Sequence, residues 1–411
     1  MNLIKKAVLF FKREGLRSTL VRITQKIYEM LCKIPGNVEE RIFRKRFCQQ
    51  LAEHTAGKQV YIVMACIDWK IPLFQRPHQI ATVLSNRENT HVLFLSEKQR
   101  YDRFPGMFAV NPHLDVVSEG LAPVFREALT SAERVTVLKS WPRQAHLLDS
   151  IPYDALVYEY IDDLSLFYYY TDALKKKHYD LIRQADLTTC TARALYEDAL
   201  PIAKKAILSP NAGDYDFFHN NQNCSAYPGL AVKTQGYDCV IGYYGCLAAW
   251  FDYDLVLSVA KFRPNWCFVL VGYCFDGTIS RLQEETLDNI ILYPAQPYAE
   301  LPRFVSAFDI QTIPFVINDI TKATSPVKLF EYMAVGKPIL TSAMPECLRY
   351  KSVTIYRDID DFIEKAEHLL HIRNNPDYIA QMDMEAKNNT WDARVSEILA
   401  ELNRGNSYEN Q

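Results

Sequence analysis

Short apolar runs rich in β-branched and aromatic residues alternate with helical patterns along most of this chain. A first series occupies residues 59–64, 91–95, 114–117, 134–138, 155–158, 187–190 and 206–208, and a second occupies 239–245, 268–272, 289–293, 308–315 and 337–340. Strands joined through helices make right-handed crossovers, so this pattern predicts an α/β fold with parallel sheets covered on both faces. In such sheets ligands lie beyond the carboxyl ends of the strands.

Length and composition limit the number and kind of domains. At 411 residues, with 49% hydrophobic and 23% charged residues, the chain is typical of a globular protein of two domains. A net charge of -3 gives no support for nucleic-acid binding. No apolar run is long enough to span a bilayer, which predicts a cytoplasmic protein or one on a membrane face.

The cysteine pattern gives no sign of disulfides or of a metal site. The ten cysteines form no C-x-x-C pair, so we expect buried thiols and neither disulfides nor a zinc site.

The segment between the last two runs of the second series predicts a helix with an anion site at its start. Ser325 is expected to cap this helix, Pro326 suits its first position and Gly336 can end it. The unpaired amides of the first turn, the helix dipole and the ammonium of Lys328 attract an anion. Glu331 lies on the same face, one turn further on. This arrangement suits a nucleotide diphosphate, with its phosphates at the helix start and its ribose at the carboxylate.

This helix resembles the donor-nucleotide helix of GT-B-fold glycosyltransferases, in the family 4 and family 1-like branch of bacterial polysaccharide assembly. The resemblance is carried by Ser325-Pro326-x-Lys328-Leu329-Phe330-Glu331-Tyr332-Met333-Ala334-x-Gly336-Lys337-Pro338. It implies that Glu331 binds the donor ribose and that Lys328 lies near the diphosphate. Many retaining members carry a second glutamate at the position of Ala323, so the stereochemical outcome stays open. The alternative is an ordinary amphipathic helix with a surface Lys-Glu pair.

The resemblance implies two Rossmann-like parallel-sheet domains that face a cleft. The predicted parts are a basic, amphipathic N-terminal helical segment (1–57), an acceptor domain (58–218), a linker (219–235), a nucleotide-sugar donor domain (236–376) and a C-terminal helix that crosses back to the first domain (377–411). The first 33 residues hold eight lysines and arginines against two glutamates. Two interpretations stay open for them: peripheral binding to the anionic inner face of the cytoplasmic membrane, or packing on the protein itself.

Two loops of the first domain follow predicted strands and contain candidate site residues. The loop 68–79 resembles a tryptophan and Arg-Pro-x-Gln signature of related enzymes. Trp69 and Arg76 are therefore expected at the cleft. Arg76 is expected to bind an anionic group of the donor or acceptor, and His78 to form a hydrogen bond with a sugar hydroxyl.

The loop 158–165 resembles a Tyr-x-x-x-Asp-Asp element. Either Asp162 or Asp163 is expected to act as a general base on the acceptor, while Asp163 could instead cap the next helix.

Further donor-site candidates come from the second domain. Gly245 ends a strand and lets a ligand approach the backbone. The resemblance places the donor base beside the loop that contains Gln296, and Asn318 and Thr324 are expected to face the same pocket. Related enzymes often carry an arginine and a lysine soon after this first glycine, but residues 246–251 hold neither. Lys328 must therefore supply more of the positive charge, and we count it with the catalytic residues.

Patterns typical of other chemistries have simpler explanations. Asp252 and Asp254 form an Asp-x-Asp pair, which more plausibly opens a helix than holds a metal ion. His368 and His371 have no third ligand nearby, and no dinucleotide or P-loop motif follows a strand. No metal and no cofactor is expected.

The predicted function is transfer of a sugar from a nucleotide-sugar, with a UDP-sugar as the expected donor. The expected acceptor is a carbohydrate or lipid-linked saccharide in cell-surface polysaccharide biosynthesis, such as capsule or exopolysaccharide. Two alternatives stay open. One is a sugar-nucleotide epimerase or hydrolase on the same fold, and the other is a non-catalytic nucleotide-sugar-binding module at the membrane.

Overall fold

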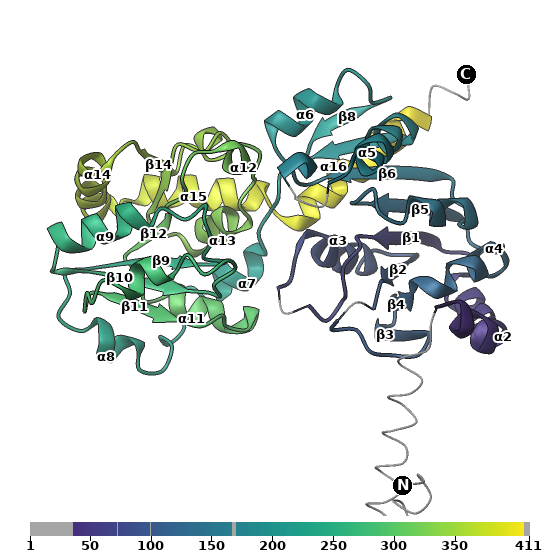
Figure 1. Ribbon diagram of the computed structural model, residues 1–411, viewed down its shortest axis with the longest axis horizontal. Helices are drawn as coiled ribbons and strands as arrows, with labels where there is room; N and C mark the ends of the chain where they lie inside the picture. The colour runs from purple at the N-terminus through teal and green to yellow at the C-terminus, as the bar shows by residue number, and fades with distance from the viewer. Residues whose placement is uncertain (1–35, 72, 99, 167–169, 407–411) are drawn as a thin grey trace, which may run out of the picture. The chain divides into compact units, whose positions relative to one another are not determined.

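The structure is a computed structural model that describes residues 36–71, 73–98, 100–166 and 170–406 (Figure 1). The chain divides into two compact units, one formed by the chain up to Tyr158 with Lys176–Asp186, and one formed by Glu159–Lys175 with the chain from Leu187 onward. The predicted basic segment of residues 1–33 lies outside the described residues. Among the helices of the described ranges, none has both the length and the hydropathy that crossing a membrane requires.

The first sheet has eight strands in the order β3-β4-β2-β1-β5-β6-β7-β8. Its strands are β1 (Gln59–Met64), β2 (Thr90–Ser96), β3 (Met107–Asn111), β4 (Leu114–Ser118), β5 (Arg134–Lys139), β6 (Ala155–Tyr160), β7 (Leu187–Cys190) and β8 (Ala206–Leu208). Seven of them coincide with the predicted series. The sequence analysis missed β3, an apolar edge strand that is antiparallel to β4 and whose side chains are half-buried or exposed. It is joined directly to β4 as a hairpin, so it does not fit a pattern in which each strand is followed by a helix.

Helices and 3-10 turns connect the strands of the first sheet. They are α2 (Gly36–Thr55), α3 (Arg76–Ser85), η1 (Glu119–Val124), α4 (Phe125–Ala128), η2 (Ala145–Ser150), η3 (Leu164–Leu166), α5 (Asp172–Gln184) and α6 (Arg193–Ala199). Helix α3 packs on β1, β2 and β4, and α2 contacts β2, α4 and η1. Packed helices and short connections hold the carboxyl ends of these strands at one edge of the sheet, as a parallel sheet requires.

The second sheet has six parallel strands in the order β11-β10-β9-β12-β13-β14. They are β9 (Cys239–Tyr244), β10 (Trp266–Val271), β11 (Ile290–Tyr293), β12 (Ile310–Ile313), β13 (Ile339–Ser342) and β14 (Val353–Tyr356). The order reverses between β9 and β12, and this is the point where doubly wound sheets bind their ligands. The predicted parallel sheets are confirmed for both series, with β3 as the antiparallel exception.

The remaining helices all follow β8 in the chain and complete the fold. They are α7 (Tyr215–Asn220), α8 (Leu230–Thr234), α9 (Tyr253–Phe262), α10 (Ser280–Gln283), η4 (Tyr298–Glu300), α11 (Leu301–Val305), α12 (Asp319–Lys322), α13 (Val327–Val335), η5 (Cys347–Arg349), α14 (Ile359–Ile372), α15 (Pro376–Asn388) and α16 (Trp391–Asn406). Helices α9 and α14 contact each other and lie along the same face of the sheet. Asp252 caps α9 by accepting a hydrogen bond from Leu255 N at 2.9 Å, so the predicted helix start is confirmed.

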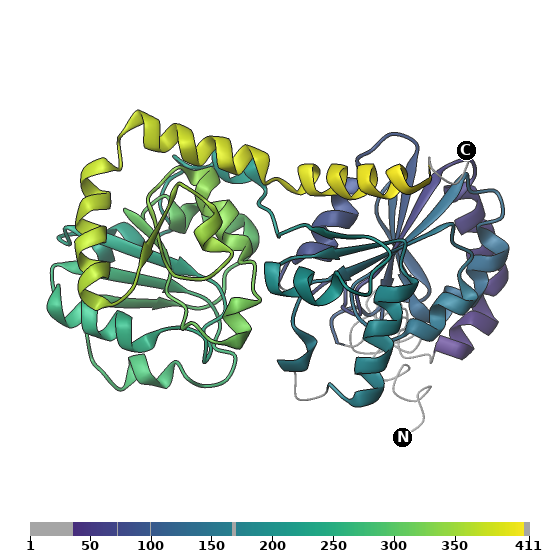
Figure 2. The ribbon, with the colours of Figure 1, turned by 90° about the horizontal axis from the view of Figure 1, so that it is seen from above.

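The C-terminal part contains two helices where a single helix over residues 377–411 was expected. Figure 2 shows α15 and α16 as separate segments, which meet at residues 389–390. Helix α16 buries one apolar stripe, since Trp391, Val395, Ile398 and Leu402 recur at helical spacing and are each at most 6% exposed. A crossing of this helix back to the first domain remains a prediction.

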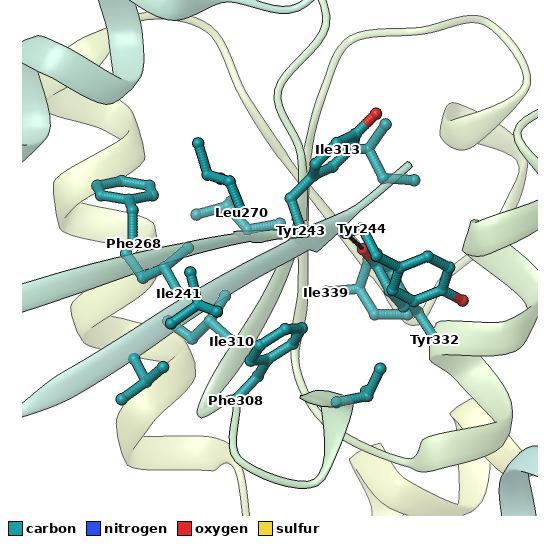
Figure 3. Packing of buried hydrophobic residues seen from close by; sticks show 14 of the residues in the cluster. Ile241, Tyr243, Tyr244, Phe268, Leu270, Phe308, Ile310, Ile313, Tyr332 and Ile339 are labelled. Carbon is teal, nitrogen blue, oxygen red and sulfur yellow. Dashed lines mark hydrogen bonds between the residues drawn. The ribbon is translucent and has the colours of Figure 1, made fainter. Parts of the chain in front are cut away.

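The core of the second sheet leads directly to the candidate site. Figure 3 shows Phe268 and Leu270 of β10 and Ile310 of β12, which lie in the strands on either side of β9 and are all fully buried. Tyr243 and Tyr244 end β9 and point to opposite faces of the sheet, as neighbouring strand residues do. Their burial among these apolar side chains fixes their rings, and both rings contribute to the site described next.

Candidate donor and acceptor sites

Helix α13 begins one residue later than the sequence predicts. Pro326 occupies the N-cap position in an extended conformation, and the helix starts at Val327. The prediction that Ser325 caps the helix is wrong, because the backbone N–H of Asn211 donates to the Ser325 hydroxyl at 3.1 Å and the Asn211 side chain donates to the Ser325 carbonyl at 2.7 Å. The predicted end is confirmed, since Gly336 has a φ of +74° and its N–H donates to the Met333 carbonyl.

Lys328 lies in the first turn of α13 with its ammonium among aromatic rings. Its Nζ is 5.3 Å from the ring centre of Tyr243 and 5.1 Å from that of Phe315. Burial lowers the pKa of Lys328 to about 8, and Glu331 partly offsets that effect. Among the described carboxylates, none forms an ion pair with this lysine. The site therefore holds a largely desolvated positive charge without a protein anion to neutralise it.

Gly245 brings the backbone after β9 against this lysine. Its φ is +139°, and a Cβ at this position would lie 2.9 Å from Lys328 Cε and 3.3 Å from Nζ. Any other residue would be strained and would displace the lysine side chain. Gly245 and Lys328, which the sequence placed in one donor site, are thus brought together by the fold.

Glu331 lies one turn deeper and is 3% exposed. Tyr244 donates a short hydrogen bond to its Oε2, and Tyr298 donates to its Oε1 at 2.7 Å. Burial raises the pKa of Glu331, while the two phenol hydroxyls and Lys328 lower it. Tyr244 is buried in β9, whereas Tyr298 is half-buried in η4 and stacks on Phe217 with ring centres 5.3 Å apart. The carboxylate is therefore held in a fixed orientation by hydroxyl groups.

The other predicted donor residues form local contacts. The Gln296 amide donates to the Pro294 carbonyl at 3.0 Å, Asn318 caps α12 by accepting from Thr321 N, and the Thr324 hydroxyl donates to the Ile320 carbonyl at 2.7 Å. Within the described chain, no hydrogen bond joins these three side chains to Lys328 or Glu331. Their contact with a donor remains a prediction.

Asp162 and Asp163 follow β6 and differ in their surroundings. Asp163 Oδ1 accepts from the backbone N–H of Ser165 at 3.0 Å and from its hydroxyl at 2.6 Å, so Asp163 caps η3. Within the described residues, the Asp162 carboxylate accepts no such hydrogen bonds. Burial, together with the charge of Asp163, raises the pKa of Asp162 to about 6. The sequence left the choice between the two open. The local geometry favours Asp162 as the carboxylate available to a substrate.

The loop after β1 is locked by two buried aspartates. Asp68 accepts backbone hydrogen bonds from Arg100 and Tyr101, each at 2.7 Å. Asp102 accepts in return from the backbone of Trp69, at 2.5 Å, and of the residue after it. This reciprocal exchange fixes the loop that carries the predicted cleft residues.

Within this loop, the three predicted residues have different environments. Trp69 is half-buried, and its ring centre is 5.0 Å from that of Phe94. Arg76 begins α3 and is 4% exposed. His78 is fully buried: Nε2 donates to the carbonyl of Trp69 at 3.1 Å, and Nδ1 accepts from Gln75 N at 3.2 Å. Both ring nitrogens of His78 are thus engaged by the protein, which argues against the predicted contact with a sugar hydroxyl.

A cluster of charged groups that the sequence did not single out lies at the carboxyl ends of the first sheet. Lys139 ends β5, is fully buried, and has its Nζ 3.4 Å from Cys66 Sγ. Burial lowers the pKa of Lys139. Arg143 pairs with Glu97 at 3.3 Å, and burial together with the charge of Glu97 raises the pKa of Glu119 to about 7. Because these groups come from separate segments of the chain, only the fold brings them together.

The raised pKa of Glu119 predicts a pH-dependent effect on stability. Because its pKa in the folded state exceeds the unfolded value, its contribution is fully present below about pH 4.5 and is lost as the pH rises to 7. We expect Glu119→Gln to be more stable relative to the wild type at pH 8 than at pH 5, by roughly 1 kcal/mol once solvent screening is allowed for. Urea unfolding at the two pH values measures this difference. Glu88→Gln, at an exposed position, is the control and should show no such difference.

Comparisons with known proteins relate this chain to glycosyltransferases. A family model described as glycosyl transferase-like matches residues 255–400, which include α13 with Lys328 and Glu331. The putative teichuronic acid biosynthesis glycosyltransferase TuaH of Bacillus subtilis is 22% identical over 385 residues, which cover 83% of this chain and 96% of TuaH.

Solved structures agree on the fold. Anabaena Alr3699/HepE in complex with UDP superposes with a TM-score of 0.57 and 14% identity, covering 85% of this chain and 100% of that one. The α,α-trehalose 6-phosphate synthase of Burkholderia multivorans gives a TM-score of 0.60 with 9% identity, covering 86% and 100%. The chain has the GT-B fold of these enzymes, and its residues 255–400 match a glycosyl transferase-like family model. The predicted fold is therefore confirmed, and the predicted glycosyltransferase class is supported.

Two tyrosines of the candidate donor site were missed by the sequence analysis. Tyr244 and Tyr298 lie 87 and 33 residues from Glu331, to which they donate. Tyr244 looked like an ordinary member of a buried strand, and Tyr298 like part of a polar loop. No local motif marks a tyrosine as the partner of a distant carboxylate, so only the sheet order reveals this contact.

Proposed function

We propose that this glycosyltransferase uses a nucleoside diphosphate sugar as its donor, with a UDP-sugar as the expected substrate. The observation that carries the proposal is the unpaired ammonium of Lys328, held between Gly245 and the start of α13. A buried cation is costly without an anion, and a diphosphate would supply that anion. The complexes of HepE with UDP and with UDP-glucose agree with this donor class.

The proposed reaction moves the sugar to an acceptor hydroxyl. The hydroxyl oxygen forms a bond to the anomeric carbon, and the bond from that carbon to the diphosphate oxygen breaks with its electron pair on the diphosphate. Lys328 and the first-turn amides of α13 stabilise the charge that develops there, so we propose that transfer requires no metal. Asp162 is proposed to accept the proton of the attacking hydroxyl as a general base.

We propose a saccharide or lipid-linked saccharide acceptor in cell-surface polysaccharide biosynthesis. The likeness to TuaH, whose name assigns it to teichuronic acid biosynthesis, supports this choice. A panel of nucleotide-sugars, incubated with and without saccharide acceptors, tests it. Release of nucleoside diphosphate that requires an acceptor would support transfer. Release without one would support hydrolysis, and binding without turnover would support a non-catalytic module.

We also propose that the basic segment of residues 1–33 holds the enzyme at the inner face of the cytoplasmic membrane. Its excess of six positive charges, eight against two, favours an anionic leaflet. Deletion of residues 1–33 should move the protein from the membrane fraction to the soluble fraction of a cell lysate. An unchanged distribution would instead assign this segment to the protein's own packing.

The assignment of Glu331 to the donor ribose gives a selective test. Glu331→Ala should weaken binding of UDP by about tenfold or more and leave binding of inorganic pyrophosphate nearly unchanged, because pyrophosphate has no ribose. Isothermal titration calorimetry with both ligands measures the two affinities. Equal losses for both ligands would indicate a disturbed fold and contradict the assignment.

Tyr298→Phe is the matched variant for this test. A bound ribose would replace the Tyr298 hydroxyl at Glu331 Oε1, since Tyr298 lies in a half-buried turn while Tyr244 belongs to the buried strand β9. Removal of that hydroxyl should keep or increase the affinity for UDP. A loss as large as that of Glu331→Ala would mean that the ribose does not compete with Tyr298 for the carboxylate.

A further inference from the structure

Two histidines and an aspartate converge at the edge of the first sheet opposite the candidate acceptor loops. His91 is the second residue of β2, and Asp115 is the second residue of β4. The two strands are parallel neighbours, so their amino ends lie at the same edge. His54, in the last turn of α2, reaches the same point from the helix that packs on β2.

The three side chains have the spacing of metal ligands. Asp115 Oδ2 lies 2.7 Å from His54 Nδ1 and 2.8 Å from His91 Nε2, and all the ligand atoms lie within 4.8 Å of one another. The side chains of His91 and Asp115 are each 1% exposed, whereas that of His54 is 40% exposed. The cluster is thus buried on the sheet side and open to solvent on the helix side.

A hydrogen-bonded network alone leaves this cluster incompletely satisfied. Asp115 Oδ1 and His91 Nδ1 are buried without a hydrogen-bond partner among the described residues. No lysine or arginine of the described ranges pairs with Asp115, so two imidazoles are the only groups that face its charge. Buried carboxylates are normally paired with a cation or coordinate a metal.

We propose that His54 Nδ1, His91 Nε2 and the Asp115 carboxylate bind a divalent transition metal of the zinc class. Imidazole nitrogens favour zinc over magnesium or calcium, which take oxygen ligands. Three protein ligands leave a fourth position, on the exposed side of His54, for water. The ion links α2 to two strands, so its role is to hold this helix on the sheet.

Titration of the full-length, metal-free protein with Zn²⁺ tests the proposal. We expect one saturable site whose occupation raises the melting temperature, and intense visible absorption bands when Co²⁺ replaces Zn²⁺. His54→Gln removes one ligand from a half-exposed position and should therefore keep the fold. It should weaken Zn²⁺ binding by about tenfold or more and abolish the thermal shift.

His113→Gln is the matched control. His113 is exposed, two residues from Asp115, and outside the cluster, so this variant should bind Zn²⁺ as the wild type does. The absence of saturable Zn²⁺ binding would overturn the proposal, and so would an affinity in His54→Gln equal to that of the wild type. A loss in His113→Gln as large as that in His54→Gln would likewise exclude the assigned ligands.

Discussion

Replacing Lys328 with alanine is expected to weaken binding of UDP by about tenfold or more, which corresponds to about 1.4 kcal/mol. Turnover should fall further, by about 100-fold or more, because the lysine acts most strongly on the charge that develops on the leaving diphosphate. The free energy of unfolding should stay unchanged or rise, since the substitution removes a largely desolvated ammonium that forms no ion pair with a carboxylate of the described residues. Calorimetry, steady-state kinetics and urea unfolding measure these three effects.

Lys322→Ala provides the control for this prediction. Lys322 ends α12, six residues before Lys328, and its exposed ammonium pairs with Asp319 at 3.3 Å. The Lys322→Ala substitution should have little effect on UDP affinity or on turnover.

The pH dependence of UDP binding gives a further check on Lys328. Because the pKa of Lys328 is about 8, the wild-type affinity for UDP should decrease as the pH rises through that value. An affinity for UDP that is unchanged in Lys328→Ala would contradict the donor site.

The second large effect is expected for Asp162→Asn. Loss of the proposed general base should lower turnover by about 100-fold to 10,000-fold while UDP affinity stays near that of the wild type. The wild-type rate should decrease below about pH 6, because burial and the charge of Asp163 raise the pKa of Asp162 to about 6 and only the ionised form accepts a proton. A pH profile of the transfer rate measures this limb.

Asp163→Asn is the matched control for Asp162. An asparagine oxygen can still accept the hydrogen bonds from Ser165 that begin η3, so the loop should keep its conformation. Its turnover should remain within a few fold of the wild type, and its acidic limb should shift to lower pH as the neighbouring charge is removed. Equal losses in the two variants would show that the loop, and not the carboxylate of Asp162, is required.

Most of the fold could be predicted because burial on both faces gives parallel strands a strong signal. The runs that became β1, β2, β9 and β10 are almost continuously apolar, and their burial in the structure explains that composition. The edge strand β3 was missed although it is apolar, because it pairs with β4 as an antiparallel hairpin and so lies outside the alternation of strands and helices. The register of strands and the order of the sheets come from long-range pairing, which no local pattern encodes.

The candidate donor site was predictable where its residues lie in one helix. Lys328 and Glu331 share a face of α13 by helical spacing, and Gly245 could be inferred from the strand it ends. Ser325 was misassigned because its local pattern resembles a cap, while the tertiary contact with Asn211 engages its hydroxyl. Tyr244 and Tyr298 reach Glu331 from separate elements, so their role follows from the fold alone.

A crystal structure of the full-length protein soaked with UDP tests the central claim most directly. We predict that the diphosphate lies against Gly245 and the start of α13, with a phosphate oxygen within hydrogen-bond distance of Lys328 Nζ and the ribose hydroxyls at Glu331. UDP bound at another position, with Lys328 directed away from its phosphates, would contradict the account.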